Sequence, residues 1–219
     1  MSKKIKITIA VAALLAVLTA GVVYAYLTYT AQLTNTFTVG NVSATLTEPK
    51  WAEAETANSD IHKNIYPGQS FAKDPTITMS DTSSPAVVFL EITYPYQSVV
   101  TLDNNGRKQA AADTQLFTPG TLKTGWAELT GKSVTDTTKH TITRVYAYNN
   151  ELSAKDSTTL FDTVTFANIA EGTELTQLSI KVKADIIQAG GMAKAGATYT
   201  SEELGAIYDK FVTQNASAE

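Results

Sequence analysis

Strict alternation of apolar and polar side chains is the strongest pattern in this chain, and it is clearest near the N-terminus. From residue 27 to residue 39 every even position is threonine or glutamine, and the odd positions are Leu27, Tyr29, Ala31, Leu33, Asn35, Phe37 and Val39. A period of two places alternate side chains on opposite faces, so the pattern predicts a β-strand with one apolar face. Only Asn35 interrupts that face.

Shorter runs of the same kind recur along the chain, separated by turn-forming clusters. The run at residues 86–94 is the most continuously apolar, which is typical of a strand buried on both faces. In the last run the even positions from Leu178 to Ile186 are predicted to face one side, and Lys181, Lys183 and Asp185 the other. The predicted strands after the first are 42–47, 76–79, 86–94, 123–129, 141–148, 160–166 and 175–187. We predict a polar loop at 48–64, and 109–116 fits a short helix.

The hydrophobic period changes near the C-terminus, where residues 200–212 are predicted to form a short helix. Thr200 and Glu203 have the spacing of a capping box. The apolar residues that follow recur at helical spacing. Many short strands without alternating helices predict an all-β fold. We expect a jelly-roll-like antiparallel β-sandwich at residues 40–219, with the short C-terminal helix included.

The first 25 residues have the pattern of a secretory signal peptide. Three lysines within the first six residues precede a charge-free, mostly apolar run at residues 7–23. Small residues at the −3 and −1 positions, Val23 and Ala25, predict cleavage between Ala25 and Tyr26. The alternative is an uncleaved membrane anchor, because the run is just long enough to span a bilayer. Its alanines and threonines favour cleavage, which would make residues 26–39 the new N-terminal strand.

The composition indicates in which compartment the protein is found and which classes of partner it can bind. The chain has 17 basic and 21 acidic residues, and residues 1–25 carry three lysines and no acid, so cleavage would leave a net charge of −7. Such a protein is a poor candidate for binding nucleic acid. The chain has no cysteine, and at this size it can bury a sufficient core without disulfides. We therefore expect a secreted protein of the extracellular matrix or cell surface, with a Gram-positive bacterium as the expected source and an archaeon as the alternative.

The residues give no sign of catalytic chemistry. The two histidines, His62 and His140, lie far apart and neither is in an H-E-x-x-H motif, so we interpret both as surface residues in polar loops. Asp103 begins a segment similar to a calcium loop, but Thr114 stands where the closing glutamate is needed, which favours a plain turn. The sequence therefore predicts no catalytic residue, no cofactor and no metal site, and we expect that the protein is not an enzyme.

Seven short segments carry a family resemblance. They are A-G-V-V-Y-A-Y-L-T-Y-T-A (20–31), N-T-F-T-V-G-N-V (35–42), L-T-E-P-K-W (46–51), P-G-Q-S-F-A-K-D-P (67–75), V-F-L-E-I (88–92), L-F-D-T-V-T-F (160–166) and L-S-I-K-V-K-A-D-I-I-Q-A (178–189). Together they resemble the TasA/camelysin family of exported biofilm-matrix fibre proteins. The resemblance implies processing by a dedicated ER-type signal peptidase, a jelly-roll subunit and assembly into extracellular fibres. In related fibres the N-terminal strand of one subunit completes the sheet of the next. Camelysin-type proteins are also classed as metalloproteases, but this sequence lacks the zinc motif, so that activity is not carried over.

The alternating strand supports a fibre independently of the resemblance. Residues 26–47 contain neither charge nor proline, the two devices that normally keep an exposed strand from pairing. We expect a secreted structural subunit that polymerises head to tail by donating residues 26–39 to the next subunit. Its partners would be other copies of itself, a signal peptidase during export and an accessory matrix or anchoring protein. The residues expected to fill the neighbour's groove are Leu27, Tyr29, Ala31, Leu33, Phe37 and Val39.

Two alternatives stay open at this point. The first strand can fold back into its own sheet, which would give a monomeric adhesive domain at the cell surface. The protein can also be a secreted metalloprotease of camelysin type, because catalytic sites can lie on loops without a known motif. Covalent attachment to the cell wall is not expected, because the sequence ends N-A-S-A-E without a sortase-type motif.

Overall fold

Antiparallel β-strands build the two layers of the molecule. The computed structural model describes residues 29–31, 42–63, 65–176, 178–189 and 198–216. One layer is a seven-stranded sheet with the order β1-β13-β5-β10-β8, in which β6 also pairs with β5 and β9 with β10. Its strands are β1 (Tyr29–Ala31), β5 (Ala86–Val99), β6 (Ala112–Gln115), β8 (Trp126–Glu128), β9 (Val134–Asp136), β10 (Thr141–Tyr148) and β13 (Lys181–Gln188).

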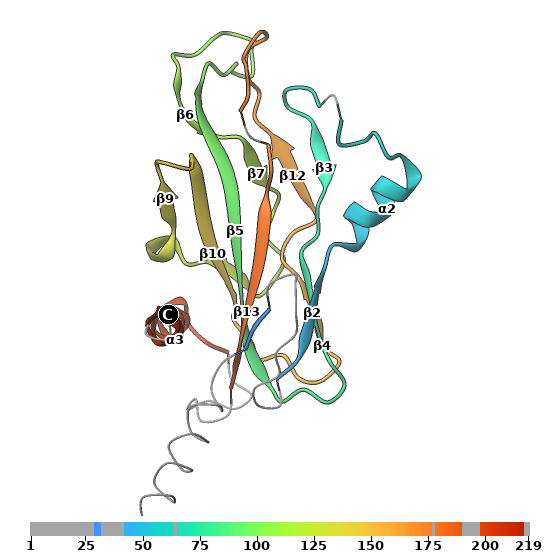
Figure 1. Cartoon of the computed structure of the whole chain (residues 1–219), viewed down its shortest axis with the longest axis vertical. Helices are drawn as coiled ribbons and strands as arrows, with labels where there is room; N and C mark the ends of the chain where they lie inside the picture. Colours follow the sequence, from blue (N-terminus) through green and yellow to red (C-terminus); the bar gives the residue numbers. More distant parts are fainter. Residues whose placement is uncertain (1–28, 32–41, 64, 177, 190–197, 217–219) are drawn as a thin grey trace, which may run out of the picture.

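The other layer consists of two three-stranded sheets, with the orders β11-β4-β2 and β3-β12-β7 (Figure 1). Their strands are β2 (Ala44–Thr47), β3 (Ser70–Ala72), β4 (Thr76–Met79), β7 (Phe117–Pro119), β11 (Ser157–Thr159) and β12 (Thr163–Phe166). The remaining elements are the helices α2 (Pro49–Ala57) and α3 (Ser201–Ala216) and the 3-10 turn η1 (Thr130–Lys132). The expected all-β sandwich with a C-terminal helix is confirmed.

The long strand β5 organises the core. It pairs with β13 on one side and with β10 on the other, and residues 86–90 have no exposed surface. Val88, Leu90 and Ile92 face the core between the two layers, whereas Val87 and Phe89 face the opposite side. The continuous apolar run that marked this strand in the sequence is therefore explained, because both faces are covered.

Helix α3 covers the second face of β5. Leu204, Tyr208 and Phe211 pack against Val87 and Phe89 in a cluster separate from the main core. Figure 1 shows α3 lying outside the large sheet, opposite to the layer that holds β2 and β3. The helix begins with the predicted capping box, because the Thr200 amide donates to Glu203 Oε2 at 2.9 Å and the Glu203 amide donates to Thr200 Oγ1 at 3.2 Å.

A group of charged residues lies beside this helix. It includes Asp185, whose predicted position on the sheet is wrong. Asp185 was expected on a polar outer face, yet it is fully buried. Lys183 Nζ lies 3.1 Å from both Asp185 Oδ2 and Glu91 Oε1, and Tyr208 OH donates to Glu91 Oε1 at 2.7 Å. Burial, together with the hydrogen bond to the Glu91 carboxylate, raises the pKa of Asp185 to about 7.

Three further sequence predictions differ from the structure. Residues 48–64 are not a loop throughout, because α2 occupies 49–57. Residues 109–116 do not form a helix. Strand β5 extends past Tyr94 to Val99, and β6 pairs with this last part of β5. The last strand begins at Lys181 rather than at Leu175. In the first two cases capping or pairing by distant residues overrides the local pattern.

The raised pKa of Asp185 predicts how stability depends on pH. The folded state binds this proton more tightly than the unfolded chain, so the free energy of unfolding falls as pH rises from about 4 to about 7. Asp185→Asn removes the titration and keeps the shape. Between pH 4 and pH 7.5 we expect wild type to lose about 1–3 kcal/mol more stability than the variant. Urea unfolding across this range measures the difference. Identical pH profiles for wild type, Asp185→Asn and the exposed control Asp81→Asn would contradict the account.

Candidate functional site

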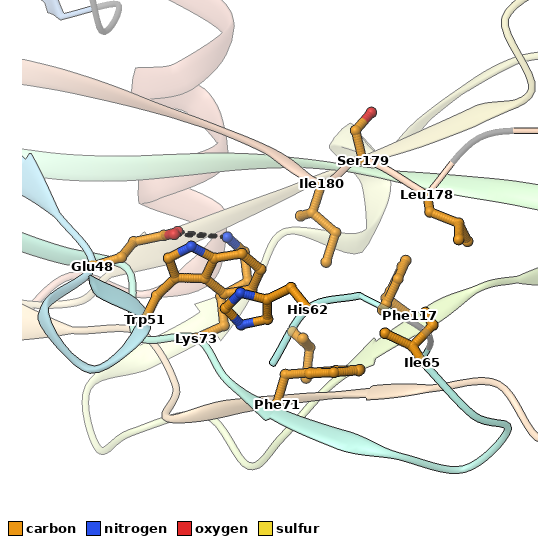
Figure 2. A pocket seen from close by; sticks show the side chains of 11 residues that line it. Glu48, Trp51, His62, Ile65, Phe71, Lys73, Phe117, Leu178, Ser179 and Ile180 are labelled. Atoms are coloured by element: carbon orange, nitrogen blue, oxygen red, sulfur yellow. Dashed lines mark hydrogen bonds and ion pairs between the residues drawn. The ribbon is translucent and has the colours of Figure 1, made fainter. Parts of the chain in front are cut away.

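Four of the segments that carried the family resemblance meet at one cavity of about 440 Å³ (Figure 2). Residues 46–51, 67–75, 160–166 and 178–189 all contribute to its walls. The cavity lies between α2 and β3 on one side and the segment leading into β13 on the other. It is lined by Glu48, Trp51, His62, Ile65, Phe71, Lys73, Phe117, Val164, Leu178, Ser179 and Ile180.

A buried ion pair stands at one end of this cavity. Lys73 is only 4% exposed, and its Nζ lies 2.7 Å and 2.9 Å from the two carboxylate oxygens of Glu48. The same ammonium lies 5.0 Å from the ring centroid of Trp51, which is a cation–π distance. A buried charge is tolerated only when it is paired in this way. The pair therefore ties the entry of α2 to the end of β3.

Asp74, the next residue, fixes where α2 begins. Its carboxylate accepts hydrogen bonds from the Lys50 amide at 2.9 Å and 3.1 Å, and from the Trp51 amide at 3.4 Å. Glu48, at the N-cap position, makes no side-chain capping bond of its own. Pro49 lacks an amide hydrogen and suits the first turn. The helix is therefore capped by a residue more than twenty positions away, which no local sequence pattern reveals.

His62 forms the floor of the cavity together with two aromatic side chains. Its ring stacks on Trp51 at 3.5 Å between centroids with an interplanar angle of 3°, and it lies 5.8 Å from Phe71. Its Nδ1 lies 3.4 Å from Glu55 Oε1, whereas its Nε2 is buried with no hydrogen-bond partner in the described structure. The prediction of a surface histidine is therefore wrong for His62. It is confirmed for His140, which is exposed.

A second cavity of about 550 Å³ adjoins the first. Glu48, Trp51, Lys73 and Ile180 line both, so the two cavities are neighbours along β13. We call the combined cavity the β13 groove. Its second part is lined in addition by Leu46, Thr47, Ala52, Lys181 and Val182.

The edge of β13 leads directly into this groove. β1 pairs with it in antiparallel register, with Tyr29 opposite Ile186, Thr30 opposite Asp185 and Ala31 opposite Ala184. Within the residues that the structure describes, strand pairing on this edge stops at Ala184. The groove-lining residue Val182 follows two positions further along the edge. The groove therefore starts where β1 ends.

The predicted polymerisation strand is only partly within the described residues. Tyr29 and Ala31 lie in β1, on the β13 edge. Leu27, Leu33, Phe37 and Val39 lie outside the described residues, as do the predicted cleavage positions Ala25 and Tyr26. For these residues the interpretation stays a prediction.

The described residues do not fit a metal centre. In the parts of the chain that the structure covers, no group of three or more His, Cys, Asp or Glu side chains is close enough to hold a metal ion. His62 contacts the carboxylate of Glu55 and two aromatic rings, and His140 packs near Tyr96 with ring centroids 5.7 Å apart. The helices within the same ranges are too short or too polar to span a membrane.

A family model described as camelysin metallo-endopeptidase matches residues 1–179. No curated protein matches the chain, and no solved structure does. The matched range includes the ion pair, the cap of α2 and the stacked rings, and it ends inside the β13 groove.

The cap on α2 predicts a specific loss of stability. Asp74→Ala removes the acceptor for the first amides of the helix, and we expect the free energy of unfolding to fall by about 1–2 kcal/mol. The matched control is Asp60→Ala, which removes an exposed ion pair with Lys63 and is expected to change stability by less than about 0.5 kcal/mol. Chemical denaturation measures both. Equal effects would show that Asp74 is not an important cap.

Proposed function

The chain belongs to the camelysin metallo-endopeptidase family, and on this premise we propose that it is a secreted structural subunit of extracellular fibres. In this proposal each subunit donates its N-terminal strand to the next. Cleavage between Ala25 and Tyr26 frees that strand on export, so secretion and assembly become coupled. N-terminal sequencing of the mature protein checks the cleavage position.

The observation that carries the proposal is the pairing of β1 with the edge of β13. A sheet edge offers unpaired backbone groups to any extended segment of suitable sequence. In the structure of the single chain its own residues 29–31 take this position. The same residues of another copy can make identical backbone contacts, because exchange of an element between copies preserves its environment.

A reason for exchange lies in the groove beyond β1. An apolar side chain the size of leucine or phenylalanine contributes roughly 1.5–3 kcal/mol when it moves from water into a buried site. The walls of the β13 groove include many apolar side chains, and Leu178 at its far end is 41% exposed. A donated strand that continues past residue 31 would cover this surface. The additional burial favours the polymer over the closed single chain.

Donation predicts that the N-terminal strand is needed for fibres and not for folding. Deleting residues 26–35 should leave a folded monomer, because the main core lies between other strands, and it should abolish fibres. Negative-stain microscopy detects the fibres, and circular dichroism detects the fold. Fibres of normal length formed by the protein without residues 26–35 would contradict the proposal.

A pair of charge variants is a matched control for this experiment. Leu33→Lys places a charge on the apolar face of the strand, whereas Gln32→Lys places it on the opposite face. We expect the first to shorten or abolish fibres and the second to leave them unchanged. Equal behaviour of the two variants would mean that the alternation of the strand does not govern assembly.

The family description favours a second candidate function, proteolysis by a metallo-endopeptidase. Purified mature protein incubated with a protein substrate, with and without chelator, tests it. The structural proposal predicts no chelator-sensitive cleavage. Cleavage that disappears with chelator, and with His62→Ala or His140→Ala, would replace the structural role with an enzymatic one.

A further inference from the structure

The β13 groove has an ion pair where its two parts meet, and most of its apolar residues lie toward its two ends. Beside Val182 the walls are Leu46 and Ala52, together with the polar residues Thr47 and Lys181. Beside Ile180, which lines both parts, stands the buried Glu48–Lys73 ion pair. At the end that holds Leu178, the walls are Ile65, Phe71, Phe117 and Val164. Figure 2 shows Ile180 and Leu178 projecting into the cavity across from the ion pair and the aromatic rings.

The register of β1 predicts which residues of a longer strand would meet these three places. Ala31 lies opposite Ala184, and in an antiparallel pair each step forward on one strand is a step back on the other. If pairing continued in this register past the first residue of β13, Lys181, then Leu33 would lie opposite Val182, Asn35 opposite Ile180 and Phe37 opposite Leu178. Directly opposed residues share a face of the sheet, so all three would face the groove.

The polarity of residues 33, 35 and 37 of the donated strand matches the polarity of the groove at the three places that they would contact. Leu33 meets an apolar part of the groove, and Phe37 meets the part with two phenylalanines. Asn35, the single polar residue on the apolar face, meets the ion pair. Its carboxamide both donates and accepts hydrogen bonds, so it suits the Glu48 carboxylate and also His62 Nε2, which is buried without a partner.

We propose that Asn35 of one subunit sets the register of the donated strand by hydrogen bonding beside the Glu48–Lys73 pair and His62 of the next subunit. This inference rests on the proposed strand donation and adds the residue that aligns it. A slip of two residues keeps the apolar face toward the groove, but it places the carboxamide against Leu178 or Val182. Either slip moves the carboxamide away from the place where the two cavities meet, at the residues Glu48, Lys73 and Ile180 that line both. A buried polar group that is displaced from its hydrogen-bond partners costs free energy, so the unslipped register is favoured.

The length of the chain disfavours its own strand as the occupant of the whole groove and favours a second copy. Leu46 and Val182 line the same part of the groove, and β2 leads toward α2 in the direction opposite to β13 (Figure 1). Val42 is four residues before Leu46, and Leu178 is four residues before Val182, so about 26 Å of strand length separates the levels of Leu178 and Val42. The five links from residue 37 to Val42 span at most about 18 Å. For a strand that fills the groove to residue 37, a return to its own β2 is therefore disfavoured.

Disulfide trapping in mixed fibres tests the register. The chain has no cysteine, so single-cysteine variants give unambiguous pairs. Subunits with Leu33→Cys are mixed with subunits carrying Val182→Cys, the matched pair, or Ile180→Cys, the slipped pair. Phe37→Cys with Leu178→Cys is a second matched pair at a more exposed position. We expect at least tenfold more mixed disulfide from matched than from slipped pairs, because opposed residues are close enough for a disulfide and diagonal ones are not.

The role of Asn35 is tested by adding Asn35→Leu to the donor subunits, with Thr34→Leu as the control on the other face. We expect Asn35→Leu subunits to form fibres still, with the matched-to-slipped ratio reduced to less than threefold. Thr34→Leu should keep the tenfold ratio. An unchanged ratio in Asn35→Leu fibres would overturn the register role while leaving strand donation intact. Fibres without mixed disulfides from either matched pair would show that the donor lies elsewhere. Failure of the unsubstituted protein to form fibres would overturn both proposals.

Discussion

The side of β13 that β1 pairs with only in part is the constraint on which this structure depends. Every backbone amide and carbonyl that is removed from water needs a partner, and β5 supplies partners on only one side of β13. On the other side β1 covers Ala184 to Ile186. The rest of that side borders an apolar groove that a strand of suitable sequence can close. The N-terminal segment, uncharged and alternating, has such a sequence, and this is why fold and assembly are linked in our account.

Contacts between residues that are distant in sequence connect the elements that form the walls of the groove. The Glu48–Lys73 pair joins the end of β2 to the end of β3, and Asp74 caps the helix that carries Trp51. Trp51 in turn stacks on His62. Glu48, Lys73, Trp51 and His62 line the cavity, and in our proposal their charges and rings contact a strand of the neighbouring subunit. A buried ion pair contributes little net stability compared with an apolar core, and it is better suited to specifying how a partner aligns.

The sequence predicted the elements that are long and regular. The strands around β5 and β10 and the capping box of α3 follow from hydrophobic period and cap spacing. Helix α2 was missed because its cap, Asp74, comes from another part of the chain. Asp185 was misplaced because the helix that buries it is distant in sequence. At the site, the segments E-P-K-W and F-A-K-D-P were visible as motifs, but only the fold shows that Glu48 and Lys73 meet.

A cryo-electron microscopy reconstruction of the fibres at side-chain resolution tests the central claim most directly. Our account predicts that the strand on the edge of β13 connects to the body of the neighbouring subunit. It also predicts continuous density through the β13 groove, with Asn35 beside Glu48 and Lys73. A strand that connects instead to β2 of the same subunit, with the groove empty, would contradict it.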